Sequence, residues 1–143
     1  MRPIRIALTK GRLEKDSVNL FDSMGLETEA IKNKGRRLIL SVSDAGVPVF
    51  EVVLAKAADV ITYVEHGVCD LGVVGKDTIA ESGGSFYEVL DLGFGRCRFA
   101  LAGPKGTDFF AGYHSRTIAS KYPNVTRAYF GRKGMDVGII KIE

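Results

Sequence analysis

The sequence has few of the residues that would place it in a disulfide-stabilised or metal-binding class. Its 143 residues include two cysteines, Cys69 and Cys97, and no tryptophan. Two cysteines without CxxC spacing do not make a disulfide framework, so we expect both to be reduced thiols. His66 and His114 stand in no ligand-spaced cluster. The histidines therefore predict no metal site.

Long apolar runs and an excess of one charge are also missing. No apolar run approaches the roughly 18 residues of a membrane span, and the N-terminal stretch MRPIRIALT is too polar for a signal peptide. The 20 basic and 17 acidic residues are spread along the chain and leave a net charge of +3, so no polybasic tail indicates nucleic acid or lipid. We therefore expect a cytoplasmic protein that binds small molecules, with no nucleic-acid or membrane partner.

What the chain does have is a hydrophobic fraction of 45%, enough for one core and part of a second domain. Apolar periodicity and turn residues predict an ordered series of elements. The first are a strand at 4–8, a helix at 13–24 stopped by Gly25, and strands at 36–43 and 47–55 joined by a turn. They are followed by a helix at 59–64 ended by Gly67, a strand at 69–74, and a short helix capped by Asp77 or Thr78 and closed by Gly83-Gly84. This order predicts an α/β layer with helices over a largely parallel sheet.

The pattern changes at Tyr87. The stretch YEVLDLGFGRCRFALAG is long, apolar and contains three glycines, which predicts a strand that leaves one domain and enters another. After it we expect a strand at 116–120 and a helix at 124–133 with Val125, Ala128 and Tyr129 on its inner side. Gly134 stops this helix, and a last strand follows in DVGIIKIE. The sequence therefore predicts a first domain over residues 1–92 and a partial second domain over residues 93–143.

The stretch TKGRL, residues 9–13, joins the first strand to the first helix through Lys10, Gly11 and Arg12. Such a turn directs backbone N–H groups and side-chain cations at one point, which suits an anion. The alternative is an ordinary strand-to-helix turn with solvated cations.

A second candidate loop lies in DLGVVGKD, residues 70–77, where Gly72 and Gly75 allow the backbone to approach a ligand. The alternative is a tight turn without a ligand. Clefts of open α/β sheets lie at the carboxyl ends of the strands, so we expect this loop and residues 9–12 at one mouth.

Three further arginines are candidates for binding an anion. Arg37 stands at the start of a predicted strand, from which its guanidinium can hold a phosphate or carboxylate. Arg96 and Arg98 occupy alternate positions, so they face the same way on an extended strand. Lys56 and Asp59, three residues apart, are interpreted as a structural pair on a helix. The sequence shows no catalytic triad and no paired carboxylates, which favours chemistry by positioning of charged substrates, as in phosphoryl or glycosyl transfer.

Taken together, these motifs resemble a known family. TKGRL, GRRL, DVITYVEHGVCDLGVVGKD, LGFGRCRFALAGP and RTIASKYPNVTRAYF occur in the same order as in the short form of ATP phosphoribosyltransferase, the enzyme that opens histidine biosynthesis. The resemblance covers essentially the whole chain, and the combination is specific although each motif alone is weak.

The resemblance implies a two-domain α/β fold like that of the type II periplasmic binding proteins, with the second domain incomplete here. ATP and phosphoribosyl pyrophosphate would lie in the interdomain cleft, N1 of adenine would attack the anomeric carbon, and pyrophosphate would leave with Mg²⁺ bound. The residues carried over as substrate-binding are Lys10, Gly11, Arg12, Arg37, Asp70, Gly72, Gly75, Arg96 and Arg98. No residue is carried over as a protein nucleophile.

The resemblance also implies an oligomer with a regulatory subunit similar to a histidyl-tRNA synthetase. Family members continue past the strand that matches DVGIIKIE into an Asp-led Thr-Gly-x-Thr turn for the ribose phosphate, and this sequence has no Thr-Gly dipeptide. We therefore expect a chain that lacks this loop and is inactive by itself. Two alternatives stay open: a non-catalytic small-ligand module of the periplasmic-binding-protein type, and an unstable fragment with exposed strand edges.

Overall fold

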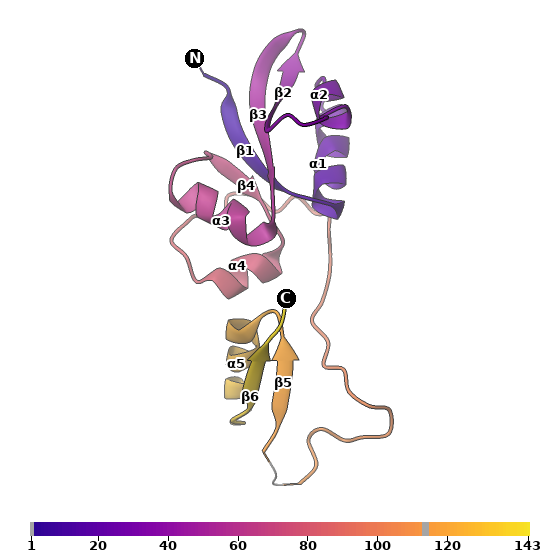
Figure 1. Ribbon diagram of the computed structural model, residues 1–143, viewed down its shortest axis with the longest axis vertical. Coiled ribbons are helices and arrows are strands. Elements are labelled where there is room, and N and C mark those ends of the chain that lie inside the picture. The colour runs from indigo at the N-terminus through magenta and orange to yellow at the C-terminus, as the bar shows by residue number, and fades with distance from the viewer. Residues whose placement is uncertain (1, 113–114) are drawn as a thin grey trace. The chain divides into compact units, whose positions relative to one another are not determined.

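The computed structural model describes residues 2–112 and 115–143 (Figure 1). The chain divides into two compact units, Met1–Arg96 and Cys97–Glu143. His114 lies outside the described residues. Within the described part of the chain, no helix has the length and apolar character needed to cross a membrane.

The first unit is a mixed α/β layer, as the order of elements in the sequence predicts. Its elements are β1 (Ile4–Thr9), α1 (Arg12–Ser23), α2 (Glu29–Lys32), β2 (Ile39–Asp44), β3 (Val47–Ala55), α3 (Ala57–Glu65), β4 (Leu71–Val73) and α4 (Lys76–Ser82). The sheet has the order β2-β3-β1-β4, with β1 parallel to both β3 and β4 and β2 antiparallel to β3. The largely parallel sheet is therefore confirmed.

Helices cover both faces of this sheet. Successive residues of a strand point to opposite faces, and the apolar residues of β1 therefore contribute to a core on each side. Ile6 and Leu8 of β1 pack in one core with Val18 and Phe21 of α1. Ala7, which lies between them, belongs to a second core whose members include Ala55, Val60 of α3 and Cys69. In Figure 1, α1 and α2 lie on one side of the sheet and α3 on the other.

A turn joins β2 to β3, as the sequence predicts, and it consists of two residues, Ala45 and Gly46. Ala45 has φ 48° and Gly46 has φ 79°, and positive φ at both central residues is what the preferred hairpin turn requires. The backbone N–H of Gly46 donates to Oε1 of Glu27 at 3.1 Å, which ties the turn to the segment between α1 and α2. Ala45 is the one non-glycine residue with positive φ among the described residues.

The second unit contains a small parallel sheet and one helix: β5 (Thr117–Ser120), α5 (Pro123–Arg132) and β6 (Gly138–Lys141). Gly134, with φ 66°, follows the helix as predicted. The predicted inner face of α5 is wrong in part, because Phe130 is the buried residue of this helix and Tyr129 is 41% exposed. The ring of Phe130 packs against Phe109, 5.7 Å between centroids.

Two other sequence predictions for the fold are wrong. Residues 87–103 form no strand, and Tyr87 is 95% exposed. A strand needs a partner, and no described segment pairs with this one. The short fourth helix begins at Lys76 with Gly75 as its N-cap, so Asp77 lies in its first turn instead of capping it.

Candidate functional site

One edge of the first unit's sheet gathers the loops that the sequence singled out. Because β1, β3 and β4 are parallel, their carboxyl ends meet at the same edge, where ligands of open α/β sheets bind. The backbone N–H of Lys10 donates to the carbonyl oxygen of Ala55 at 2.9 Å, just beyond the β1–β3 ladder. On the other side, Oγ1 of Thr9 donates to the carbonyl oxygen of Val73 at 2.8 Å. The loops after β1 and β4 therefore lie at the same edge of the sheet, as predicted.

Gly11 sets the geometry of the turn between β1 and α1. It is the N-cap residue of α1, with φ 96° and ψ −126°, a conformation that side chains of L-residues strongly disfavour. A Cβ atom built on Gly11 would meet nothing within 4 Å, so the backbone conformation and not space demands glycine. No side chain caps the helix, and its first N–H groups remain without a side-chain partner. Such uncapped N–H groups at the start of a helix are suited to binding an anion.

Three of the predicted cations stand at this edge. Lys10 and Arg12 flank Gly11 directly. Arg37 lies two residues before β2, whose first residue, Ile39, pairs with Val53 near the carboxyl end of β3. The ion pairs found among the described residues include none of Lys10, Arg12 and Arg37. All three side chains are exposed and available to a ligand.

The structure does not bring Asp70 together with these cations. Asp70 precedes β4, so it lies at the amino ends of the parallel strands, opposite the edge of Lys10. Its carboxylate accepts two hydrogen bonds from Arg2, at 2.8 and 3.0 Å, and one from the backbone N–H of Arg5 at 2.9 Å. The hydrogen bonds from Arg2 are the main cause, and the Arg5 N–H the second, of a lowered pKa of Asp70. The observed role of this carboxylate is to hold the start of β1.

The two glycines of the β4 loop have different surroundings. A Cβ atom on Gly72 would lie 2.7 Å from Cγ1 of Val60 and 3.0 Å from Cγ2 of Val64, so Gly72 lets α3 pack closely on the sheet. Gly75 has φ −70°, which any residue adopts, and a Cβ there would meet only the side chain of Asp77. At Gly75, therefore, neither the backbone conformation nor the backbone of a neighbouring element demands glycine.

Arg96 and Arg98 fall in different units. Gly95 approaches α1 closely, since a Cβ on it would lie 2.6 Å from Cδ2 of Leu13, and Arg96 follows this contact. The first unit therefore places Arg96 beside the start of α1, next to the turn that holds Arg12. Arg98 belongs to the second unit, in a stretch without regular secondary structure.

Sequence reasoning missed Lys56 as a member of this edge. Lys56 directly follows β3 and is the N-cap residue of α3, with no side-chain hydrogen bond capping the helix. The predicted pairing with Asp59 is not found among the ion pairs of the described residues. The missed signal is the order strand, cation, helix, which VPVFEVVLAKAAD shares with the stretch around TKGRL.

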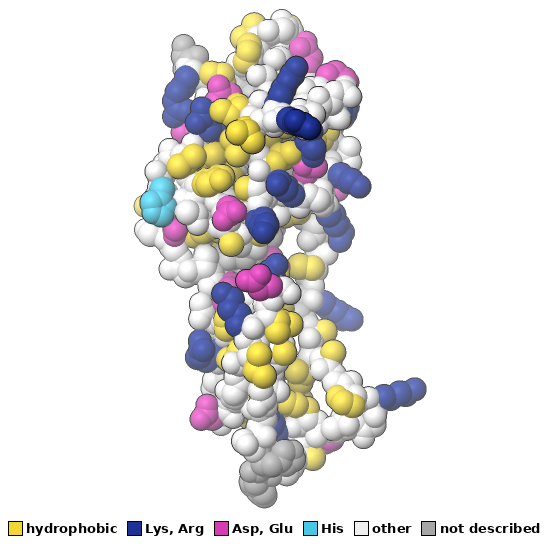
Figure 2. Space-filling model, viewed as in Figure 1, with side chains coloured by type: hydrophobic (Ala, Val, Ile, Leu, Met, Phe, Trp, Pro, Cys, Tyr) yellow, Lys and Arg dark blue, Asp and Glu magenta, His cyan; other side chains and the backbone are white. Residues whose placement is uncertain are grey.

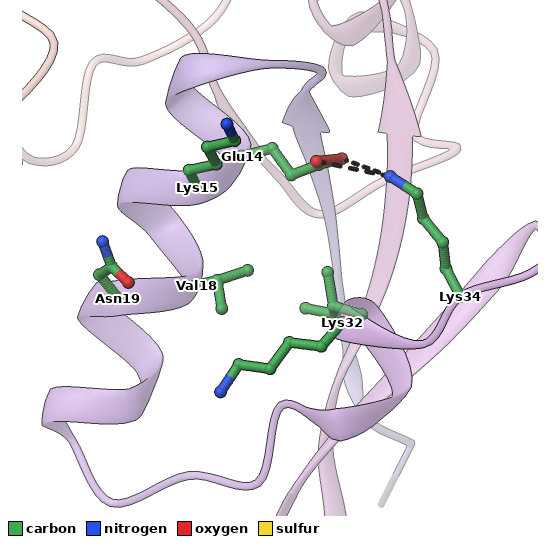
Figure 3. A pocket seen from close by; sticks show the side chains of 7 residues that line it. Glu14, Lys15, Val18, Asn19, Lys32 and Lys34 are labelled. Carbon is green, nitrogen blue, oxygen red and sulfur yellow. Dashed lines mark hydrogen bonds and ion pairs between the residues drawn. The ribbon is translucent and has the colours of Figure 1, made fainter.

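A separate groove of about 350 Å³ lies between α1 and α2 (Figure 3). Its lining residues are Glu14, Lys15, Val18, Asn19, Ile31, Lys32 and Lys34. Lys34 pairs with Glu14 at 3.2 Å and Lys32 pairs with Asp22 at 3.0 Å. Two of its three lysines are thus already neutralised, which makes this groove a weaker anion site than the sheet edge.

Basic side chains do not gather in a single patch on the face that Figure 2 shows, where Lys and Arg are scattered among acidic and hydrophobic side chains. Among residues 2–112 and 115–143, no group of three or more His, Cys, Asp or Glu side chains is placed to hold a metal ion. The described side chains at the sheet edge thus offer cations for an anionic ligand.

Known proteins resemble this chain along nearly its whole length. A family model described as HisG, ATP phosphoribosyltransferase, matches residues 56–143. An ATP phosphoribosyltransferase of Clostridium kluyveri is 55% identical over 142 residues, 99% of this chain and 64% of the relative. That of Clostridium acetobutylicum is 53% identical over 142 residues, 99% of this chain and 65% of the relative. The chain therefore spans slightly less than two thirds of the length of these relatives.

A solved structure agrees with the sequence relatives. It is described as an ATP phosphoribosyl transferase (HisG:HisZ) complex from Thermotoga maritima, and one of its chains matches with a TM-score of 0.67 and 26% identity. The match covers 98% of this chain and 64% of that chain. The family model covers more than half of the 143 residues, and two relatives above 50% identity cover nearly all of them. This chain belongs to the ATP phosphoribosyltransferase family.

Proposed function

We propose that this chain carries the nucleotide-binding part of an enzyme that transfers a phosphoribosyl group from phosphoribosyl pyrophosphate to N1 of ATP. The products are phosphoribosyl-ATP and pyrophosphate, in the first step of histidine biosynthesis. The observation that carries the proposal is the sheet edge where Lys10, Gly11 and Arg12 present two cations and an uncapped helix start. Family membership supports the same reaction.

The proposed reaction needs no nucleophile from the protein. The lone pair of N1 forms a bond to the anomeric carbon, and the bond from that carbon to the pyrophosphate oxygen breaks, with its electron pair leaving on pyrophosphate. The chain's part is to hold the charged groups in position and to balance charge as it develops. Lys10, Arg12 and Arg37 are assigned to phosphate oxygens. Magnesium enters with the polyphosphate as part of the substrate.

The roles that we propose for the remaining predicted residues follow from their contacts. Gly75 and Arg96 border the same edge and are assigned to its lining, with Gly72 as the packing residue behind the loop. Arg98 is assigned to substrate from the second unit. Asp70 is the predicted residue that its surroundings favour least, because Arg2 and Arg5 already occupy its carboxylate.

The architecture and assembly of the whole protein belong to the same proposal. We assign a fold of the periplasmic-binding-protein type II kind, with a first domain over 1–92 and part of a second over 93–143. The Thermotoga maritima structure is a HisG:HisZ complex, and we propose a HisZ-type regulatory partner, similar to a histidyl-tRNA synthetase, for this protein in the cytoplasm. No observation favours the alternative of a non-catalytic binding module.

Calorimetric titration of ATP into the chain and into Arg12→Ala tests the proposal. A charge-assisted hydrogen bond contributes about 1.5–3 kcal/mol, so we expect Arg12→Ala to weaken ATP binding by about 1–3 kcal/mol and to leave adenosine binding unchanged. Arg132→Ala, at the end of α5, is the matched control and should bind ATP as the parent chain does. An unchanged dissociation constant for Arg12→Ala removes Arg12 from the site, and absence of ATP binding by the parent chain rejects the proposal.

A further inference from the structure

The segment that follows α4, residues 83–96, which we call the connector, is held to the first unit although it has no regular secondary structure. The backbone N–H of Ser85 donates to Oε1 of Glu65, the last residue of α3, at 3.1 Å. The carboxylate of Glu88 pairs with the ammonium group of Lys76, the first residue of α4. Because Lys76 follows β4, this ion pair brings the connector back to the carboxyl edge of the sheet.

The connector then reaches α1 at Gly95. A Cβ atom built on Gly95 would lie 2.6 Å from Cδ2 of Leu13, the second residue of α1, and Gly95 has φ 69°. The close approach and the backbone conformation both disfavour a side chain at this position. Gly93, two residues earlier, has φ 75°, but a Cβ atom there would meet no described atom within 4 Å. The two glycines share a left-handed backbone, and only Gly95 lies directly against a neighbouring side chain.

An arginine adjoins each partner of this contact, since Arg12 precedes Leu13 and Arg96 follows Gly95. Both arginine side chains are exposed, and neither belongs to the ion pairs found among residues 2–112 and 115–143. Like charges repel, so the two guanidinium groups do not draw the connector toward α1. The contact of Gly95 with Leu13, after the two anchors nearer α4, therefore determines that Arg96 stands near the turn after β1.

We propose that Leu13 and Gly95 are positioning residues, whose contact holds Arg96 beside Arg12 so that both guanidinium groups reach one anionic ligand. The inference rests on the proposed function, which places the two arginines at the ATP-binding edge. It adds to that function two apolar residues that act through Arg96 and do not touch the ligand themselves. A methyl group on Gly95 would meet Leu13 and displace the connector from α1, and Arg96 would move with it.

Calorimetric titration of ATP into Gly95→Ala and into its matched control, Gly93→Ala, tests the inference. Both variants place an alanine in left-handed backbone and bear a similar conformational cost, but only Gly95→Ala adds a methyl group against Leu13. We expect Gly95→Ala to bind ATP about 5- to 50-fold more weakly than the parent chain, because a charge-assisted hydrogen bond is weakened or lost. Gly93→Ala should stay within about twofold of the parent chain, because its methyl group meets no neighbour. Equal affinities of Gly95→Ala and the parent chain overturn the inference, as does an equal loss in both variants.

Two double variants separate this contact from a general loss of structure. Leu13→Ala removes the atoms that the new methyl group would meet, so Gly95→Ala should reduce ATP affinity much less in the Leu13→Ala background than in the parent chain. In the Arg96→Ala background, Gly95→Ala should have no further effect on ATP affinity, because the side chain through which it acts is gone. Additive losses in either double variant overturn the inference.

Limited digestion with trypsin, with mass spectrometry of the bond after Arg96, tests the contact without ATP. A protease cuts a segment in proportion to how often the segment leaves its place, so a connector displaced from α1 is cut faster. We expect this bond to be cut about 3- to 30-fold faster in Gly95→Ala than in Gly93→Ala. If the parent chain binds no ATP but this difference is present, the placement of Arg96 by Gly95 stands and the proposed function fails. Equal rates of cleavage overturn the inference, whether or not ATP binds.

Discussion

Arg2 holds the carboxylate of Asp70 with two hydrogen bonds, 2.8 Å from Nη2 to Oδ1 and 3.0 Å from Nη1 to Oδ2. The same carboxylate accepts the backbone N–H of Arg5 at 2.9 Å. This contact closes the sheet at the end opposite the candidate site, where it joins the beginning of β1 to the residue before β4. Asp70, a predicted substrate-binding residue, thus has a structural contact of its own in the fold.

The contribution of Asp70 to the stability of the fold should depend on pH. Because its partners lower the pKa of Asp70, the carboxylate stabilises the fold fully above the pKa of an unfolded aspartate, about 3.9. That contribution is lost as the pH falls through the lower folded value. Asp70→Asn should therefore be less stable than the parent chain in urea unfolding at pH 7, and the difference should become smaller when the pH is lowered to 2. A difference that is the same at both pH values would contradict the assignment.

Gly72 and Gly75 should respond oppositely to alanine. A methyl group at Gly72 meets Val60 at 2.7 Å, so Gly72→Ala should lower the free energy of unfolding by about 1–3 kcal/mol, the usual cost of overpacking. Gly75→Ala has an allowed φ and only the flexible side chain of Asp77 to displace, so its stability should change by less than about 0.5 kcal/mol.

The same two variants distinguish an effect on packing from an effect on ligand binding. If the backbone of Gly75 borders the nucleotide, Gly75→Ala weakens ATP binding in calorimetry while its unfolding curve stays in place. Unchanged ATP affinity in Gly75→Ala would remove the β4 loop from the site. Equal stability losses in the two variants would contradict the difference in their surroundings.

The hairpin turn offers a stabilising substitution. Ala45 has φ 48° in a turn whose second central residue is Gly46, and the left-handed region costs an alanine about 1 kcal/mol. Asparagine tolerates this conformation and Asn-Gly is the preferred dipeptide for such a turn. Ala45→Asn should raise the free energy of unfolding by about 0.5–1 kcal/mol, measured by urea titration. Ala45→Val should lower it, and a gain in both variants would count against the conformational explanation.

The two cysteines should differ in reactivity. Cys69 is buried, 2% exposed, and burial is the largest cause of a raised pKa of its thiol, whereas Cys97 is exposed. Since the thiolate is the reactive form, an aromatic disulfide reagent at pH 8 should modify one thiol quickly in the native chain and the second only after unfolding. Cys97→Ser should abolish the fast phase, and two fast thiols would show that the core around Cys69 opens readily.

The sequence predicted those parts of the fold that local pattern controls. The first strand and helix, the β2–β3 hairpin and the glycine stops at Gly25, Gly67 and Gly134 have strong periodicity or turn residues, and all are present. The helix α2 was missed because its four residues bury only Ile31, too little to leave a period. Which residues of α5 are buried depends on the segment that packs against the helix. Here the ring of Phe109 packs against Phe130.

The candidate site was predictable only where it follows one strand. The motif TKGRL contains its own strand, cations and helix start, so its geometry could be expected from its letters. The positions of Lys56 and Asp70 depend instead on how the strands pair. The pairing of β3 with β1 brings Lys56 to the candidate site, whereas Asp70 lies at the other end of the sheet, where Arg2 binds it. Neither pairing is visible in the spacing of the residues, since the partners are 46 and 68 positions apart.

Small side chains under α3 have a consequence for charge as well as for packing. Ala7 and Gly72 are register partners on neighbouring strands, and Val60 of α3 rests over them. The distance between α3 and the sheet is therefore limited only by the methyl group of Ala7 and the hydrogen atoms of Gly72, the smallest side chains available. We expect a larger side chain at Ala7 or Gly72 to move the first turn of α3 away from the sheet, and Lys56 with it. The volume of these two core residues would then help to determine where a surface charge stands at the candidate site.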